Sequence, residues 1–239
     1  MKHKFFIITI LFMAIMVGNH VAQAADVTGS IDFNSAYEWR GLIFNDGLVA
    51  QPSVDISSGG FGFNVWGNID LDDYDKTLEE GKFSEIDLTL SYSFNIDSLS
   101  ISAGVIEYLF PNTTSHSTRE AFLSLGVGII DGLSLAFDGY YDFEEVDDYY
   151  LNLGISYELE PVKDLTVAST ISVGAAGEDA SSGEDGGFHD YKIALSIGYA
   201  VTKEMSVAVN AAYVSNVDDD VLADPDVNFY GGLGISYQF

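Results

Sequence analysis

Apolar and polar residues alternate strictly along much of the chain. The clearest run places Ile86, Leu88, Leu90, Tyr92 and Phe94 between Glu85, Asp87, Thr89, Ser91 and Ser93. Because successive side chains of a β-strand point to opposite faces, this period of two predicts a strand with one apolar and one polar face. The pattern returns over 151–158 and 191–199. These runs approach the length of about ten residues with which a tilted strand crosses a bilayer.

The same pattern predicts twelve strands in total. We expect them at 27–39, 48–57, 60–70, 84–95, 98–109, 118–129, 133–142, 149–159, 165–175, 189–201, 205–215 and 228–239. The connections between them alternate between tight turns, such as Ile96-Asp97, and long polar loops, such as 177–188. Short turns at one end and long loops at the other are typical of an outer-membrane barrel, whose short turns face the periplasm.

A soluble β-sandwich also has alternating strands, so the aromatic residues decide between the two folds. A membrane barrel gathers aromatic rings at both lipid–water interfaces, whereas a sandwich core has no reason to do so. The sequence predicts one group near the long-loop ends (Tyr37, Trp39, Tyr141, Phe143, Tyr191, Tyr213, Phe229) and one near the short-turn ends (Phe61, Phe63, Phe94, Tyr157, Tyr199, Tyr237, Phe239). The predicted fold class is therefore all-β: a single antiparallel transmembrane β-barrel of twelve strands with longer acidic extracellular loops.

The first residues predict secretion. A basic start at Met1–Lys4 and an apolar run from Phe5 to Val17 precede the small residues of Ala22-Gln23-Ala24. This is the pattern of a secretory signal peptide, and the apolar run is shorter than the roughly 20 residues that span a bilayer as a helix. We predict a signal peptide at 1–24 and the barrel at 25–239, delivered across the inner membrane to the outer membrane of a Gram-negative bacterium.

Composition narrows the function classes. The 239 residues include 37 acidic and 9 basic side chains, giving a formal net charge of −28, and 47% of the residues are hydrophobic. That apolar content excludes a disordered chain. A strongly acidic chain would repel nucleic acid, so no nucleic-acid partner is expected. The absence of cysteine excludes disulfides and thiolate chemistry. We predict no cofactor and no dedicated metal site.

Catalytic residues are scarce. His116 lies in a polar loop and His189 opens a strand beside Asp190. A lipase or protease of the outer membrane needs a histidine next to a nucleophile or paired carboxylates, and no spacing in this chain brings such a set together. We expect His116 to be a solvated loop residue and His189 a rim residue, and we predict no enzymatic activity.

The last strand carries a candidate insertion signal. Apolar residues occupy every second position of Leu233–Phe239, and the chain ends on Phe239. This resembles the C-terminal signal by which outer-membrane barrels are recognised for insertion, so we assign Tyr237 and Phe239 to it. The resemblance implies outer-membrane lipid and the barrel-assembly machinery as partners.

The N-terminal region resembles a known family. Ser35-Ala36-Tyr37-Glu38-Trp39-Arg40-Gly41, followed by Asn45-Asp46-Gly47 and by Phe63-Asn64-Val65-Trp66-Gly67, is similar to the N-terminal hairpin of the TorF-type porin family, bacterial outer-membrane barrels formerly of unknown function. Members commonly carry Phe-Arg-Gly where this chain has Trp39-Arg40-Gly41. The resemblance implies a barrel and a channel, and it brings no established substrate.

The long loops are rich in acids, for example around Asp72–Asp75 and Asp218–Asp220. A solvated surface accounts for most such residues. Carboxylates are also hard oxygen ligands, so these loops are candidates for binding divalent cations, although the EF-hand spacing is absent.

Two functions compete for such a barrel. One is a porin-like channel for passive diffusion of small solutes, and the other is a closed structural or adhesive barrel whose acidic loops bind cations or an external partner. Small residues at inward positions, such as Gly154, Ser156 and Ala168, favour the channel, whereas Trp66, Phe122, Tyr140, Tyr150 and Tyr230 could narrow it. We also expect cation preference, because the predicted charged lumen residues are mostly acids: Asp32, Glu38, Arg40, Asp55, Glu85, Asp87, Asp138, Glu158 and Lys192. Arg40 is expected to pair with Glu38 at the rim.

Overall fold

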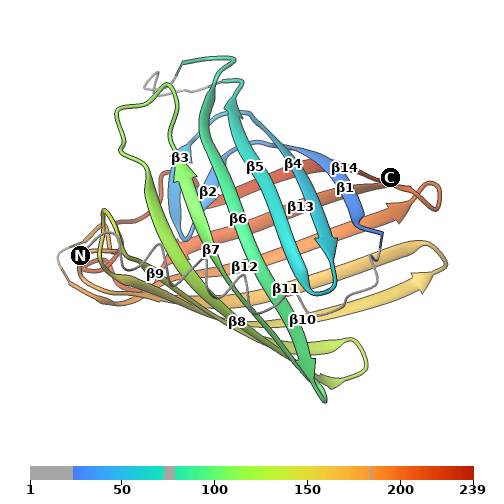
Figure 1. Cartoon of the computed structure of the whole chain (residues 1–239). Coiled ribbons are helices and arrows are strands. Elements are labelled where there is room, and N and C mark those ends of the chain that lie inside the picture. Colours follow the sequence, from blue (N-terminus) through green and yellow to red (C-terminus); the bar gives the residue numbers. More distant parts are fainter. Residues whose placement is uncertain (1–23, 73–78, 184) are drawn as a thin grey trace.

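In the computed structural model, the chain forms a closed barrel of antiparallel strands (Figure 1). The structure describes residues 24–72, 79–183 and 185–239. Apart from Ala24, the predicted signal peptide lies outside the described residues. The wall consists of β1 (Asp26–Asn34), β4 (Val49–Ser58), β5 (Phe61–Asp70), β6 (Phe83–Ile96), β7 (Leu99–Leu109), β8 (Thr118–Ile130), β9 (Leu133–Asp142), β10 (Tyr149–Val162), β11 (Leu165–Ala176), β12 (Gly187–Ala200), β13 (Met205–Asn216) and β14 (Phe229–Gln238).

These are the twelve strands that the alternation predicts, so the predicted fold class is confirmed. Each strand pairs with its neighbours in the wall, and β1 closes the barrel by pairing with both β4 and β14. Closure leaves no free sheet edge, which is the condition for placing strands in hydrocarbon, where water cannot satisfy unpaired backbone groups. Within the described residues no helix has the length and apolarity to cross a membrane.

The outer face of the wall is apolar. Large aliphatic side chains on it remain exposed in every part of the circumference, for example Leu90 (44%), Leu153 (52%), Ile171 (55%) and Leu233 (61%). Such a continuous exposed apolar surface is uncommon on soluble monomers and is the lipid-facing band of a membrane barrel. The alternate residues, mostly polar or small, therefore face the lumen.

The connections alternate in length as predicted. Turns at 59–60, 97–98, 131–132, 163–164 and 201–204 join strands at one end of the barrel, and the longer loops lie at the other. The backbone of Gly59, Gly60 and Gly132 has positive φ, which lets the chain reverse within two residues.

The first strand ends earlier than predicted. β1 stops at Asn34, and the segment up to Trp39 does not continue in the wall. Instead, β2 (Tyr37–Trp39) and β3 (Leu42–Asn45) form a separate two-stranded hairpin, drawn inside the barrel in Figure 1. The prediction of a wall strand over 27–39 is thus wrong at its end, and Tyr37 and Trp39 belong to this inner hairpin rather than to an aromatic belt.

Candidate pore constriction

The inner hairpin, defined as residues 37–45, enters the barrel from the long-loop end. Its turn is Arg40-Gly41, with φ of 52° and 80°. Positive φ at both central residues is the mark of the tight hairpin turn that matches strand twist. For Arg40 this backbone costs about 1–2 kcal/mol, because its Cβ crowds the following carbonyl. Contacts of the Arg40 side chain must offset that cost.

The Arg40 side chain reaches the barrel wall at Glu120 of β8. The two guanidinium nitrogens Nη1 and Nη2 each donate to one carboxylate oxygen at 2.7 Å, forming a bidentate ion pair. The side chains are only 12% and 6% exposed. Burial alone would lower the pKa of Arg40, but the hydrogen bonds and charge of Glu120 outweigh it and raise this pKa, so the guanidinium stays charged. The sequence prediction that Arg40 pairs with Glu38 is therefore wrong.

Aromatic rings surround the same guanidinium. Its central carbon lies 4.2 Å from the centres of the Trp39 and Tyr140 rings and 4.7 Å from that of Tyr150. Ring faces attract cations electrostatically, most strongly where water is excluded. The Tyr108 hydroxyl donates to Glu120 at 2.8 Å, and the Tyr150 hydroxyl donates to Asp190 at 2.9 Å, so both the carboxylate and one of the rings are held in place.

Glu38 binds the opposite side of the wall. Its side chain is 1% exposed and forms an ion pair with Lys192 of β12. It also accepts from the Tyr230 hydroxyl of β14 at 2.7 Å and from the Gly41 amide at 2.8 Å. Because Arg40 holds β8 and Glu38 holds β12 and β14, the turn spans the lumen between distant strands.

Polar side chains fix the base of the hairpin. The Tyr37 hydroxyl donates to Glu85 at 2.8 Å, and the Asn45 amide donates to Asp70 at 2.7 Å. Asn68 also donates to Asp70, at 2.9 Å. These groups are all nearly fully buried. Buried polar groups destabilise a fold unless they are hydrogen-bonded, and here the hairpin and the wall satisfy each other.

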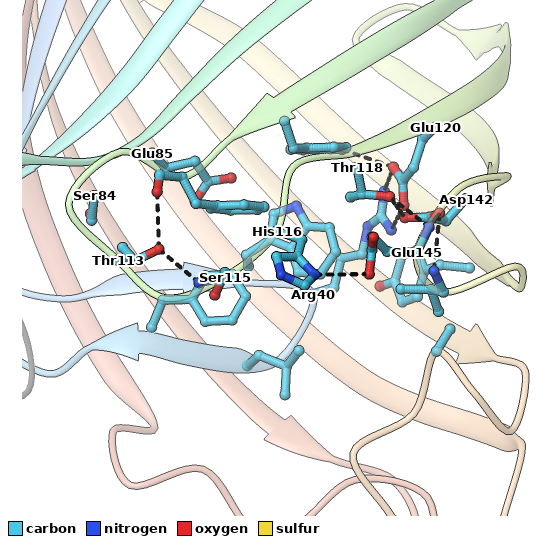
Figure 2. Close-up of a pocket in the computed structure, with 18 of the residues that line it drawn as sticks. Arg40, Ser84, Glu85, Thr113, Ser115, His116, Thr118, Glu120, Asp142 and Glu145 are labelled. Carbon is cyan, nitrogen blue, oxygen red and sulfur yellow. Dashed lines mark hydrogen bonds and ion pairs between the residues drawn. The ribbon is translucent and has the colours of Figure 1, made fainter.

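Two cavities adjoin the hairpin. The outer one, about 1070 Å³, opens among the long loops and includes Thr113, His116 and Asp148 in its lining. The inner one, about 420 Å³, lies deeper against Ile106, Asn152 and Ser172. Both are lined by Trp39, Arg40, Tyr108 and Tyr150, so the Arg40 contacts separate them. Figure 2 shows Arg40 beside Glu120 in the outer cavity. We call these contacts the pore constriction.

The predicted lumen residues divide into two groups. Glu38 and Arg40 belong to the inner hairpin, Lys192 pairs with Glu38, and Glu85 accepts from Tyr37 at the base of the hairpin. Asp87 lies two residues from Glu85 on the same face of β6, and its buried Oδ1 has no hydrogen-bond partner among the described residues. The others lie elsewhere on the wall strands: Asp32 on β1, Asp55 on β4, Asp138 on β9 and Glu158 on β10. Asp55 accepts from Asn64 at 2.8 Å, and Asp138 from Asn152 at 3.4 Å. Their effect on ion selectivity stays a prediction.

Some residues of the site were not predicted from the sequence. Tyr108 belongs to no sequence motif, and its role is apparent only from the structure, where its hydroxyl donates to Glu120. His189 was expected at the rim, yet it is 1% exposed, with Nδ1 3.1 Å from Asp190. A β-bulge between β11 and β12 adds one residue to β12, so both His189 and Asp190 turn inward. No sequence signal marks that extra residue.

The two histidines among the described residues lie beside carboxylates: His189 beside Asp190, and the exposed His116 beside Glu145 at 3.5 Å. The absence of enzymatic activity stays a prediction. Asp142, the last residue of β9, organises the loop that follows it, because it accepts from the amides of Glu144, Glu145 and Val146. Within the described ranges no three potential metal-ligating side chains gather, and cation binding by the loops remains a prediction.

The C-terminal residues close the wall at the short-turn end. The Phe239 amide donates to the Val27 carbonyl at 2.9 Å, and its ring packs edge-on against Tyr237 at 5.0 Å. Phe239 is 80% exposed on the outer face. This position suits a recognition signal, and that role of Tyr237 and Phe239 stays a prediction.

A closed twelve-stranded barrel with a lipid-facing band and an inward loop defines a protein with the architecture of outer-membrane porins. The chain belongs to a family described as "Bacterial protein of unknown function (Gcw_chp)", whose model matches residues 19–230. The finer assignment to TorF-type porins stays a prediction. No curated protein matches the sequence.

Solved structures share this fold. The KdgM porin has a TM-score of 0.58 at 16% identity, covering 88% of this chain and 99% of its own. The NanC porin has a TM-score of 0.55 at 13% identity, covering 90% and 100%. An outer-membrane channel from Pseudomonas putida F1 has a TM-score of 0.53 at 11% identity, covering 92% and 97%. At such low identity the likeness establishes the fold alone.

Proposed function

We propose that the protein is an outer-membrane channel for passive diffusion of small solutes, with the inner hairpin as its constriction. The observation that carries this proposal is the pair of cavities that meet at Arg40, one opening among the loops and one deeper in the barrel. Beyond the hairpin, inward residues such as Asp55 and Glu158 are exposed, which supports a water-filled lower lumen. The neighbouring porins and the lipid-facing band support an outer-membrane location.

The charge of the lumen supports cation preference. Of the bases in the described part of the chain, Arg40 and Lys192 lie in the lumen, and each pairs with an acid. Among the described residues, no ion pair with a base includes Asp32, Asp55, Asp138 or Glu158. A low-dielectric wall focuses this field and raises the local cation concentration. One solved KdgM porin is in complex with oligogalacturonate, a polyanion. The acidic lumen of the present chain favours cations instead.

Single-channel recording of the refolded mature chain tests the proposal. We expect discrete conductance steps, and a reversal potential under a KCl gradient with the sign of K⁺ permeation. An anion-selective or unselective value would contradict cation preference.

The alternative is a closed structural or adhesive barrel, and the buried polar contacts of the hairpin favour it. A variant in which residues 38–43 are replaced by a Gly/Ser linker separates the two proposals. If the natural chain gives no conductance steps and the variant does, the hairpin is a permanent plug, and the proposal of a closed barrel is correct.

A further inference from the structure

The groups that hold the Arg40 guanidinium belong mainly to the barrel wall. Tyr108 lies on β7, Glu120 on β8, Tyr140 on β9 and Tyr150 on β10, and these neighbouring strands bring the four side chains onto one patch of the lumen. We call this patch the wall site. The hairpin supplies Arg40 itself and the Trp39 ring. The wall site would therefore persist if the arginine were removed.

The chemistry of the wall site matches a guanidinium ion. Both oxygens of Glu120 receive parallel N–H donors at 2.7 Å, a geometry that the planar fork of a guanidinium provides and an ammonium does not. Tyr140 and Tyr150 offer ring faces at 4.2 and 4.7 Å. The ion is thus held by a carboxylate and flat aromatic surfaces together, which is how proteins recognise planar cations.

Hydrogen bonds within the barrel wall orient part of the wall site. The Tyr108 hydroxyl bonds Glu120 Oε2, and Asp190 fixes the Tyr150 hydroxyl, so the carboxylate and one ring are oriented by neighbours outside the hairpin. Glu120, Tyr108 and Tyr150 are 4%, 5% and 7% exposed. Groups that are already oriented lose little entropy on binding, and this preorganisation raises affinity.

The wall site also has an approach from outside. Glu120, Tyr108 and Tyr150 all line the outer cavity, which is large enough for a small organic solute. Glu145 and Asp148 line the same cavity, so its mouth attracts cations. From these contacts we propose that the wall site is a binding site for guanidinium-bearing solutes, with Arg40 as its internal occupant and an incoming solute as the competitor. Any effect on conductance rests on the proposed channel function, whereas binding does not.

The binding test uses Arg40→Gly, which empties the wall site and suits the left-handed backbone at this turn. Trp66→Phe in the same chain leaves Trp39, beside the site, as the single tryptophan. The probe is methylguanidinium chloride, and methylammonium chloride at equal ionic strength is the control cation. We expect methylguanidinium to quench the Trp39 fluorescence in a saturable way. Methylammonium should bind at least about tenfold more weakly, because only the planar guanidinium ion can bond both oxygens of Glu120.

Adding Glu120→Gln is the matched control, and it should weaken methylguanidinium binding at least about tenfold. Arg40→Ala repeats the titration should the glycine variant fold poorly, as judged by heat-modifiable migration on a gel. Absence of saturable binding in the folded variant, an equal response to both cations, or binding that is insensitive to Glu120→Gln would each overturn the wall site.

Recordings in planar bilayers give the second readout. Methylguanidinium added at the long-loop side should lower the conductance of the Arg40→Gly channel and leave Arg40→Gly/Glu120→Gln unchanged. A conducting Arg40→Gly channel that does not respond would overturn the proposal. If neither the natural chain nor the variants conduct, the channel function fails, and the fluorescence titration still decides whether the wall site binds guanidinium.

Discussion

At the scale of single residues, two of the ion pairs among the described residues differ sharply in their exposure to water. Arg40 and Glu120 are buried and bidentate, whereas Lys82 and Glu79 have side chains 50% and 61% exposed. An exposed pair is screened by water and contributes at most about 1 kcal/mol. A buried pair costs desolvation when it forms, and losing one partner then leaves an uncompensated charge. The constriction thus depends on both partners being present.

Replacing Glu120 should consequently destabilise the protein far more than replacing Glu79. We expect Glu120→Gln to lower the free energy of unfolding by about 3 kcal/mol, because Arg40 keeps its charge but loses its counter-charge. Glu79→Gln, the same chemical change in the exposed pair, should cost within about 1 kcal/mol. Urea unfolding of the refolded barrel in detergent, followed by tryptophan fluorescence, measures both. Equal losses would mean that the buried pair is energetically unimportant.

Gly41 offers a second residue-scale test. Its φ is +80°, and a Cβ at this position would lie 2.7 Å from both Asp190 Cβ and Leu222 Cδ2. Gly59 has a φ of +59° with no atom within 4 Å of such a Cβ. Gly59→Ala should therefore cost only backbone strain, about 1 kcal/mol, whereas Gly41→Ala adds overpacking of about 1–3 kcal/mol. We expect faster hydrogen exchange over 37–45 in Gly41→Ala alone. Identical exchange in both variants would show that the hairpin is not packed against β12.

At the scale of elements, the wall strands were predictable and the inner hairpin was not. Alternation sets the direction of every side chain in a strand, so it defines β6 or β10 without reference to any other segment. The apolar-polar pattern continues through Tyr37, Glu38 and Trp39, and it therefore hides the end of β1. The partner of Arg40 is 80 residues away in the sequence, and local periodicity carries no information about such a contact.

The bulge in β12 illustrates the same limit. One extra residue reverses the alternation, so Phe188 points outward at 63% exposure while His189 and Asp190 are buried. A strand can still be predicted when one residue is inserted, but the face to which each of its side chains points can no longer be predicted. Predictions of the wall were accordingly more reliable than those of the site.

The last strand carries a prediction of its own. Phe239 and Phe229 are exposed aromatic residues close to opposite ends of the same strand, β14, at 80% and 68%. If the terminal ring is part of an insertion signal, Phe239→Ser should lower the amount of protein in isolated outer membranes several-fold, and Phe229→Ser should lower it less. Immunoblots of membrane fractions measure this. Equal amounts of both variants and the natural chain would remove the case for the signal.

At the scale of the whole molecule, negative charge occurs in two places with different surroundings. The long loops carry exposed acids in water, including Glu178, Asp224 and Asp226. A second group of acids lies on the lumen side of the wall, which is a low-dielectric surrounding: Asp87, Asp138 and Glu158. Salt screens exposed charges beyond about 10 Å at 0.1 M and about 30 Å at 0.01 M. The two groups should therefore respond differently to ionic strength.

Neutralising each group separates their contributions to selectivity. In a KCl gradient, Asp87→Asn/Asp138→Asn/Glu158→Gln should shift the reversal potential toward zero at both low and high salt, because these acids act on ions within the bore. Glu178→Gln/Asp224→Asn/Asp226→Asn replaces the same number of acidic side chains in the loops. This variant should shift the reversal potential at about 0.01 M salt but little at 0.5 M, where the Debye length falls below that at 0.1 M. Measurements at two mean concentrations with one concentration ratio make the comparison direct. If the loop variant shifts the potential as strongly at high salt as the wall variant does, selectivity resides at the mouth, and the wall acids have only a structural role.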